Sequence, residues 1–258
     1  MTHRRFRTHT AADGFDRSAE QYERARPGYP VAAVRTLAKA LGIGPGRTVV
    51  ELASGTGKFT RALLPFGATI VGVEPLEGMR AVFERVVPTV AVLPGTAESI
   101  PLPAGFADAV VVAAAFHWFR PRPAVREIAR VLRPAGGIGL VWNTRDDASP
   151  FSAGMSVIVD RYRGSAPRAR PGGSETAFGR PGSPFRPLHY RRFRQVQRLT
   201  LSGAVDRVLC VSYIASLPAN EQRRIAVEVR ALFRRVRSAE RGSIALPYWT
   251  DIYWARRR

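Results

Sequence analysis

Val49 to Thr60 reads VVELASGTGKFT, and this stretch decides the fold because three kinds of segment meet in it. Its first residues form a continuous apolar run, typical of a strand buried on both faces. A turn of small residues, 53–57, follows and leads into a run with helical spacing. Strand, glycine-containing turn and helix in this order are typical of a ligand site at the end of a parallel strand.

The same alternation continues along the chain. Apolar runs with the length of strands alternate with runs whose apolar residues recur at helical spacing. We expect strands at 69–75, 89–96, 106–116 and 136–143, and helices at 57–67, 76–87 and 122–132. This pattern predicts a mostly parallel sheet covered by helices on both faces, a Rossmann-like, doubly wound α/β fold.

The rhythm changes after Thr144. We expect a helix at 151–164, a strand at 193–203, helices at 207–217 and 220–236, and a final strand at 242–258. Residues 165–187 are rich in Gly, Pro, Ser and Arg, which predicts a surface loop, either flexible or acting as a flap.

Composition narrows the class of protein. The 258 residues are 45% hydrophobic, enough for one large core, and no uncharged apolar run is long enough to span a membrane. Cys210 is the only cysteine, so an internal disulfide or a cysteine-based metal site is excluded. We expect a soluble, cytoplasmic monomer or homodimer that binds neither metal nor membrane.

The formal net charge of +20 raises the question of nucleic-acid binding. Apart from Lys39 and Lys58 the cations are arginines, which form short separate clusters rather than one stripe. A GC-rich coding bias gives the same composition, so nucleic acid is the less favoured partner but is not excluded.

Three kinds of nucleotide site compete for the turn after the first strand. A phosphate-binding P-loop needs glycine five residues before Gly57 and Ser or Thr after Lys58, but Leu52 and Phe59 stand there. A dinucleotide fingerprint needs glycine or alanine three residues after Gly57, where Thr60 stands, which weakens that alternative. A nucleoside with a short amino-acid tail needs only a turn of small residues that its backbone can approach.

Glu74 lies at the end of the next expected strand, in VGVEP. A carboxylate there can accept hydrogen bonds from both hydroxyls of a ribose and would repel a 2′-phosphate. An ordinary acid at a strand end is the alternative of equal weight. Together, the turn and this acid favour an adenosine-type ligand.

Four ordered segments resemble the motifs of one family. They are ELASGTG (51–57), GVEPLEGM (72–79), GTAESIPLPAGFADAVVVAAAFHWF (95–119) and EIARVLRPAGGIGLVWN (127–143). In this order they resemble the class I S-adenosylmethionine-dependent methyltransferases, specifically the type-11 group that includes quinone-biosynthesis and trans-aconitate methyltransferases. Ala53 departs from the pattern, because glycine is commoner there. The resemblance implies a seven-stranded sheet whose C-terminal strand is antiparallel.

The resemblance also implies a set of cofactor contacts. The first turn would hold the methionine part, Glu74 the ribose and the segment 96–98 the adenine edge, while Glu51 would orient the turn or accept from the amino group. The implied residues for S-adenosylmethionine are Tyr22, Arg26, Glu51, Ala53, Ser54, Gly55, Gly57, Glu74, Pro75, Met79, Thr96, Ala97, Glu98, Ala114 and Phe116.

The run Phe116-His117-Trp118-Phe119 follows the strand expected at 106–116 and should face the reacting methyl group. His117 could be a general base, or its imidazole could bond the backbone at a crowded strand end. Trp118 and Phe119 could line the acceptor pocket with His117, although aromatic residues in such a run are commonly core.

These expectations define three parts and one function. Residues 1–35 would form a lid, 36–145 the cofactor-binding core, and 146–258 the part that completes the sheet and shapes the acceptor pocket. The expected activity is methyl transfer to a small molecule by in-line displacement, without metal. An RNA methyltransferase is the first alternative, and a nicotinamide-dependent oxidoreductase or a non-catalytic binding protein is less favoured.

Overall fold

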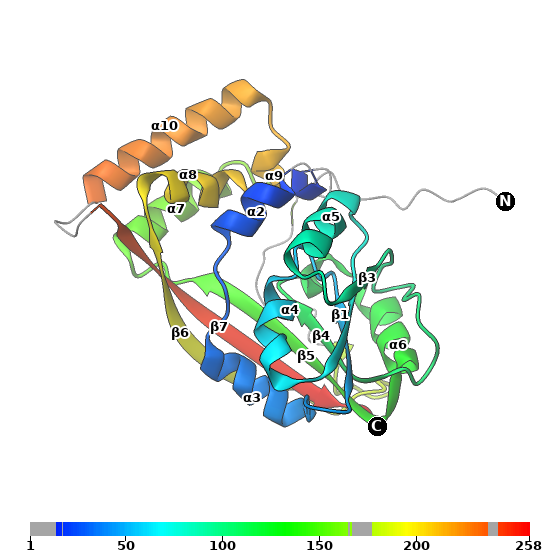
Figure 1. The fold of residues 1–258 in the computed structure, drawn as a ribbon. Helices are drawn as coiled ribbons and strands as arrows, with labels where there is room; N and C mark the ends of the chain where they lie inside the picture. The colour runs from blue at the N-terminus through cyan, green and yellow to red at the C-terminus, as the bar shows by residue number, and fades with distance from the viewer. Residues whose placement is uncertain (1–13, 17, 165, 167–176, 237–241) are drawn as a thin grey trace. The chain divides into compact units, whose positions relative to one another are not determined.

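The computed structural model describes residues 14–16, 18–164, 166, 177–236 and 242–258 (Figure 1). The chain divides into two units. The sheet unit comprises Pro27–Asp146, Pro167–Gln197 and Pro247–Arg258, and the helical unit comprises Met1–Arg26, Asp147–Ala166 and Arg198–Leu246.

The sheet has seven strands in the order β3-β2-β1-β4-β5-β7-β6. These are β1 (Thr48–Leu52), β2 (Thr69–Val73), β3 (Ala91–Leu93), β4 (Ala107–Ala113), β5 (Leu132–Arg145), β6 (His189–Leu199) and β7 (Ile244–Arg256). β1 to β5 pair in parallel and β7 pairs antiparallel with β5, which confirms the predicted fold class. The strand order reverses between β1 and β4, where a doubly wound sheet places its ligand.

Helices and apolar side chains form a core on each face of the sheet. One core contains α3 (Val31–Leu41), α4 (Lys58–Leu63) and α5 (Glu77–Val86), with Leu37, Phe59 and Phe83 buried. The other contains α6 (Pro121–Val131) together with Phe178 and Phe185. Short 3-10 helices, η1 (Leu64–Phe66) and η2 (Phe116–Trp118), follow α4 and β4. Both layers were expected from the continuous apolar strands.

The helical unit holds α2 (Ala19–Ala25), α7 (Pro150–Asp160), α8 (Leu201–Leu209), α9 (Ser212–Ala215) and α10 (Ala219–Val236). α10 buries Ile225, Val229 and Phe233 on one face, as its spacing predicted. The part of the chain that the structure describes has no helix both long and apolar enough to cross a membrane.

Several boundary expectations differ from the structure; β5, for example, begins at Leu132 rather than at Gly136. The strand expected at 193–203 ends at Leu199, because the Thr200 side chain accepts a hydrogen bond from the N–H of Gly203 and caps α8. The single helix expected at 207–217 is two, α8 and α9. The expected surface loop 165–187 ends in a packed segment: Phe178 and Phe185 are buried because their rings pack together, with centroids 5.5 Å apart. Residues 165 and 167–176 of that loop lie outside the described residues.

Candidate active site

The carboxyl ends of β1, β2 and β4 meet at one edge of the sheet. Leu52 of β1 lies in register with Val73 of β2 on one side and with Val112 of β4 on the other. The segments that leave these strands, including the turn after Leu52 and the acid after Val73, are therefore neighbours in space. This proximity was predicted from the parallel pattern.

The turn after β1 depends on left-handed backbone at three positions. Ala53, Gly55 and Gly57 have φ angles of 50°, 55° and 78°. A Cβ on Gly57 would come within 2.7 Å of the Val87 side chain, so packing as well as φ requires glycine there. A Cβ on Gly55 would meet nothing within 4 Å, so the turn is open on that side. Ala53 bears the strain that glycine would avoid.

Glu74 is fastened to this turn. It is only 4% exposed; its Oε2 accepts from the N–H of Gly55 at 2.9 Å and its Oε1 accepts from the N–H of Leu76 at 3.0 Å. The Arg80 guanidinium donates to the carbonyl oxygens of Glu74 and Pro75, which holds the backbone after β2. The two backbone bonds fix the orientation of the Glu74 carboxylate beside the turn.

Glu51 lies in the buried last part of β1. Its Oε2 accepts from the Thr60 hydroxyl at 2.5 Å, which ties the strand to α4 across the turn. Burial raises the pKa of its carboxyl to about 8, the Glu74 carboxylate adds to the rise, and the Thr60 bond offsets only part of it. A carboxyl that is neutral at pH 7 suits the predicted role of orienting the turn better than that of pairing with an ammonium group.

The segment 96–98 forms a tight turn that other residues fasten. Ala97 is buried, and the Thr96 and Ser99 backbones pair with each other. Glu98 Oε1 accepts from the N–H of Arg120 at 2.7 Å, a bond that the sequence did not predict. Glu127 accepts from the N–H of Ile100, and Arg130 donates to the carbonyls of Ile100 and Leu102. Only their helical spacing was visible in the sequence.

These features fit the nucleoside with an amino-acid tail better than a pyrophosphate. Ser54 Oγ and Thr96 Oγ1 are buried and have no hydrogen-bond partner in the described part of the chain. The turn is open beside Gly55, and the Glu74 carboxylate lies against that turn, where it would repel phosphate. Met79 is buried, and Pro75 is exposed at the same strand end.

The segment after β4 begins with another strained alanine, Ala114, at a φ of 54°. Phe116 is fully buried, and its ring lies 5.4 Å from those of Phe119 and Phe178. It is part of the core, as are the partly buried Trp118 and Phe119 that pack against it. Their predicted cofactor and acceptor contacts stay predictions.

His117 is oriented by a residue that sequence analysis missed. The indole Nε1–H of Trp142, in β5, donates to Nδ1 of His117 at 3.3 Å. An indole nitrogen can only donate, so Nδ1 carries the lone pair and the neutral imidazole has its proton on Nε2. This tautomer favours His117 as a hydrogen-bond donor rather than as the general base that we considered.

Tyr22 and Arg26 belong to the helical unit. The Arg26 guanidinium lies 4.9 Å from the centre of the Tyr22 ring, a cation–π contact, and its Nε is buried with no hydrogen-bond partner among the described residues. Their cofactor contacts, and the lid role of residues 1–35, stay predictions. Residues 1–13 and 17 of that lid lie outside the described residues.

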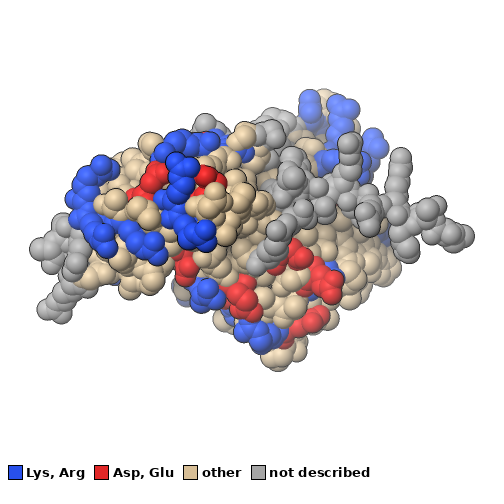
Figure 2. All heavy atoms as spheres, turned by 90° about the horizontal axis from the view of Figure 1, so that it is seen from above, with Lys and Arg blue, Asp and Glu red and all other residues tan. Residues whose placement is uncertain are grey.

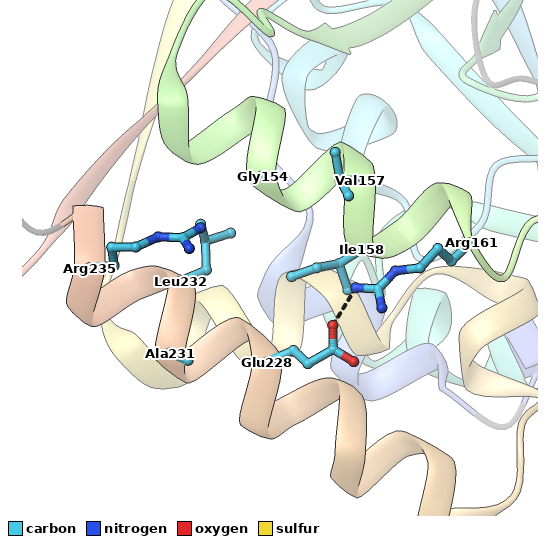
Figure 3. Close-up of a pocket in the computed structure, with 8 residues that line it drawn as sticks. All are labelled: Gly154, Val157, Ile158, Arg161, Glu228, Ala231, Leu232 and Arg235. Carbon is cyan, nitrogen blue, oxygen red and sulfur yellow. Dashed lines mark hydrogen bonds and ion pairs between the residues drawn. The ribbon is translucent and has the colours of Figure 1, made fainter.

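The helical unit has its own cavity, of about 430 Å³, between α7 and α10 (Figure 3). It is mostly apolar, with an ion pair between Arg161 and Glu228 and with Arg235 at its rim. None of its lining residues was predicted to bind the cofactor or the acceptor. Cys210 is buried, and the described residues contain no group of His, Cys, Asp and Glu side chains that could hold a metal.

Several arginines lie together on α10 of the helical unit. Figure 2 shows Lys and Arg side chains gathered over α10, whose arginines are Arg223, Arg224, Arg230, Arg234 and Arg235. Arg224 pairs with Glu221 at 3.0 Å. The arginines form only short clusters along the sequence, as predicted, but α10 carries five of them.

Comparison with known proteins points to one enzyme class. Residues 50–140 match a family model described as a methyltransferase domain. An uncharacterized methyltransferase of Mycobacterium bovis is 36% identical over 237 residues, which cover 92% of each chain. An uncharacterized methyltransferase-like protein of Schizosaccharomyces pombe is 34% identical over 223 residues, 86% of each chain. The crystal structure of a candidate type II methyltransferase from Anaeromyxobacter dehalogenans aligns with a TM-score of 0.62 at 22% identity, covering 90% of this chain and 97% of that one.

Proposed function

The chain belongs to the class I methyltransferases, in the type-11 group, and from this premise we propose that it transfers a methyl group from S-adenosylmethionine to a small-molecule acceptor. Membership of this family establishes that the chain is a methyltransferase. The cofactor and the acceptor class are the parts that we add from the geometry of the site.

One observation carries the cofactor assignment: the bond from the N–H of Gly55 to the Glu74 carboxylate. It joins the open turn after β1 to the acid after β2, so the two predicted halves of a nucleoside site lie in contact. Ribose hydroxyls would donate to the Glu74 carboxylate, and Thr96 Oγ1, which has no hydrogen-bond partner among the described residues, could bond to the ligand. Backbone at Ala53 and Gly55 would approach the amino-acid tail.

When bound, S-adenosylmethionine supplies a sulfonium-activated methyl group, which an acceptor can attack in line with the carbon–sulfur bond. The chain's contribution is then mainly positional. Holding two reactants in line contributes about 7–11 kcal/mol, whereas a proton acceptor contributes about 10²–10⁴-fold, roughly 3–5 kcal/mol. Methyl transfer can proceed at this site without a decisive base.

His117 fits a positioning role. Its Nε2 proton can be donated to an oxygen or nitrogen of the acceptor while Trp142 fixes the ring from the other side. The adjacent Trp118 ring, with its centroid 5.2 Å away, limits how the imidazole can tilt. We therefore assign His117 to orientation of the acceptor.

Calorimetry with S-adenosylhomocysteine tests the cofactor assignment. We expect binding to the wild type and a loss of about 1.5–3 kcal/mol for Glu74→Ala, because a charge-assisted hydrogen bond is removed. NAD is the control ligand; binding of NAD without S-adenosylhomocysteine would establish the oxidoreductase instead.

Incubation with radiolabelled S-adenosylmethionine and fractionated extract of the source cell tests the acceptor class. We expect the label in the small-molecule fraction. Label in RNA would replace our acceptor assignment with the RNA alternative, and binding of S-adenosylhomocysteine without any label transfer would point to a non-catalytic protein.

A further inference from the structure

A polar and aromatic row continues from His117 across β5, β7 and β6. Trp142 of β5 lies directly opposite Asp251 of β7, so their side chains share one face of the sheet. The Trp142 ring meets the edge of the Tyr253 ring at 5.9 Å, and Tyr253 lies 4.8 Å from Tyr190 of β6. The row starts at the imidazole that Trp142 orients and ends on the outermost strand, all within the sheet unit.

At the end of the row, Asp251 holds Arg192 in a fixed orientation. The Arg192 Nε donates to Asp251 Oδ1 at 2.6 Å and its Nη2 donates to Oδ2 at 3.2 Å, while the Tyr190 hydroxyl also donates to Oδ1 at 2.6 Å. The Asp251 side chain is only 2% exposed, whereas that of Arg192 is 48% exposed. The buried Asp251 carboxylate therefore binds the Nε–Nη2 edge of the guanidinium.

The other edge of the guanidinium is available to a ligand. Within the described residues, Arg192 Nη1 makes no hydrogen bond, so the Nη1–Nη2 edge can bind a second carboxylate through two parallel bonds. Aromatic rings flank it: the guanidinium carbon lies 5.4 Å from the Trp249 ring centre and 6.0 Å from that of Tyr190.

The charges along the row favour an anion. A second guanidinium, that of Arg194, lies 4.9 Å from the same Trp249 ring, and its contact with Asp146 is a long one, at 3.5 Å. Two arginines thus face Trp249, and Asp251 is the carboxylate that bonds closely to Arg192. Tyr190 is 44% exposed and offers a planar apolar surface beside them.

We propose that Arg192 recognises the acceptor, and that the acceptor is a planar molecule carrying a carboxylate. The ring of the acceptor would lie along Tyr190 and Tyr253, and its carboxylate would bind the Nη1–Nη2 edge of Arg192. This assignment rests on the proposed function for the reacting end of the row, but the binding site consists of residues outside the cofactor turn.

The test uses 2-naphthoate and its neutral analogue 2-naphthamide as probes, with binding measured by saturation-transfer NMR on the full chain. We expect the wild type to bind the acid roughly 10- to 100-fold more tightly than the amide, because only the acid brings a negative charge and two acceptor oxygens that can bond both guanidinium nitrogens. Arg192→Gln should abolish this preference and leave the affinity for S-adenosylhomocysteine unchanged.

Arg191→Gln is the matched control, since it removes the same charge from the neighbouring position, on the opposite face of β6. It should leave the preference intact. If Arg192→Gln does not fold, Arg192→Lys keeps the charge without the two-edged geometry and should still lose most of the preference.

Several outcomes would overturn the proposal: equal binding of acid and amide, no binding of either probe, or an equal loss in the Arg191 and Arg192 variants. A structural role alone predicts lower stability of Arg192→Gln with no change in probe preference. Binding of S-adenosylhomocysteine without naphthoate would refute this inference alone, and the reverse result would refute the proposed cofactor.

Discussion

Replacing Glu51 by glutamine should make the stability of the protein fall less than that of the wild type as the pH rises into the alkaline range. The carboxyl is buried, and its pKa is raised from 4.5 to about 8. The folded state therefore keeps a proton that the unfolded state has lost between these two values. The contribution of Glu51 to stability is fully present below pH 4.5 and is lost as the pH rises through 8.

The magnitude follows from the shift. Each pKa unit corresponds to about 1.4 kcal/mol, so the full rise is worth roughly 5 kcal/mol at most. Between pH 5.5 and 8.5 the wild type should lose about 3 kcal/mol of unfolding free energy through this residue. Glu51→Gln has no proton to lose, so its stability relative to the wild type should increase by that amount over the same range.

Urea unfolding of both proteins at pH 5.5 and 8.5, without cofactor, measures this difference, and any effect that does not depend on pH cancels. Glu127→Gln is the control. In the wild type, the hydrogen bond from Arg130 lowers the pKa of the Glu127 carboxyl, so Glu127 is ionised in both folded and unfolded states throughout this range. The difference in unfolding free energy between Glu127→Gln and the wild type should therefore stay constant. Parallel stability curves for wild type and Glu51→Gln would refute the argument that a neutral acid supports the turn.

The remaining predictions concern the turn, the imidazole and the arginines. Gly57→Ala should cost about 1–3 kcal/mol of stability in thermal unfolding, because φ is 78° and the new Cβ would collide with Val87. Gly55→Ala should cost less stability and mainly weaken binding of S-adenosylhomocysteine, since its Cβ would meet nothing within 4 Å. Equal stability losses in the two variants would contradict this prediction. Trp142→Phe should shift the His117 tautomer in ¹⁵N NMR spectra and raise KM for the acceptor more than it lowers kcat, and an unchanged imidazole spectrum would rule out the indole as its anchor. If the α10 arginines serve no RNA-directed function, any binding of single-stranded RNA should disappear by 200 mM salt and no label should reach RNA.

The alternation of strands and helices was predictable because the strands of the parallel sheet are mostly apolar runs. The register of these strands then placed the Gly55 turn next to Glu74 without further information. Side-chain hydrogen bonds between residues far apart in the sequence could not be predicted. Trp142 and His117 are 25 positions apart, and Arg192 and Asp251 are 59 apart. Nothing in the local pattern of either partner marks the other.

Local patterns also failed where packing or capping overrode composition. The segment that contains Phe178 and Phe185 has the glycine and proline content of an exposed loop, yet both rings are buried in the core beside α6. The start of α8 was missed because β-branched Thr200 read as part of a strand, while its side chain caps the helix. Both errors concern residues whose roles depend on partners outside a short window.

The position of β7 in the sheet has a consequence for folding during synthesis. β6 leaves the ribosome before β7, yet β7 lies between β5 and β6 in the sheet. Until β7 has emerged, β5 presents a bare hydrogen-bonding edge, and β6 with its arginines has no strand to join. Assembly of this half of the sheet must therefore wait for β7 to be synthesised, and we expect a nascent chain stalled before Ile244 to bind chaperones that shield exposed strand edges.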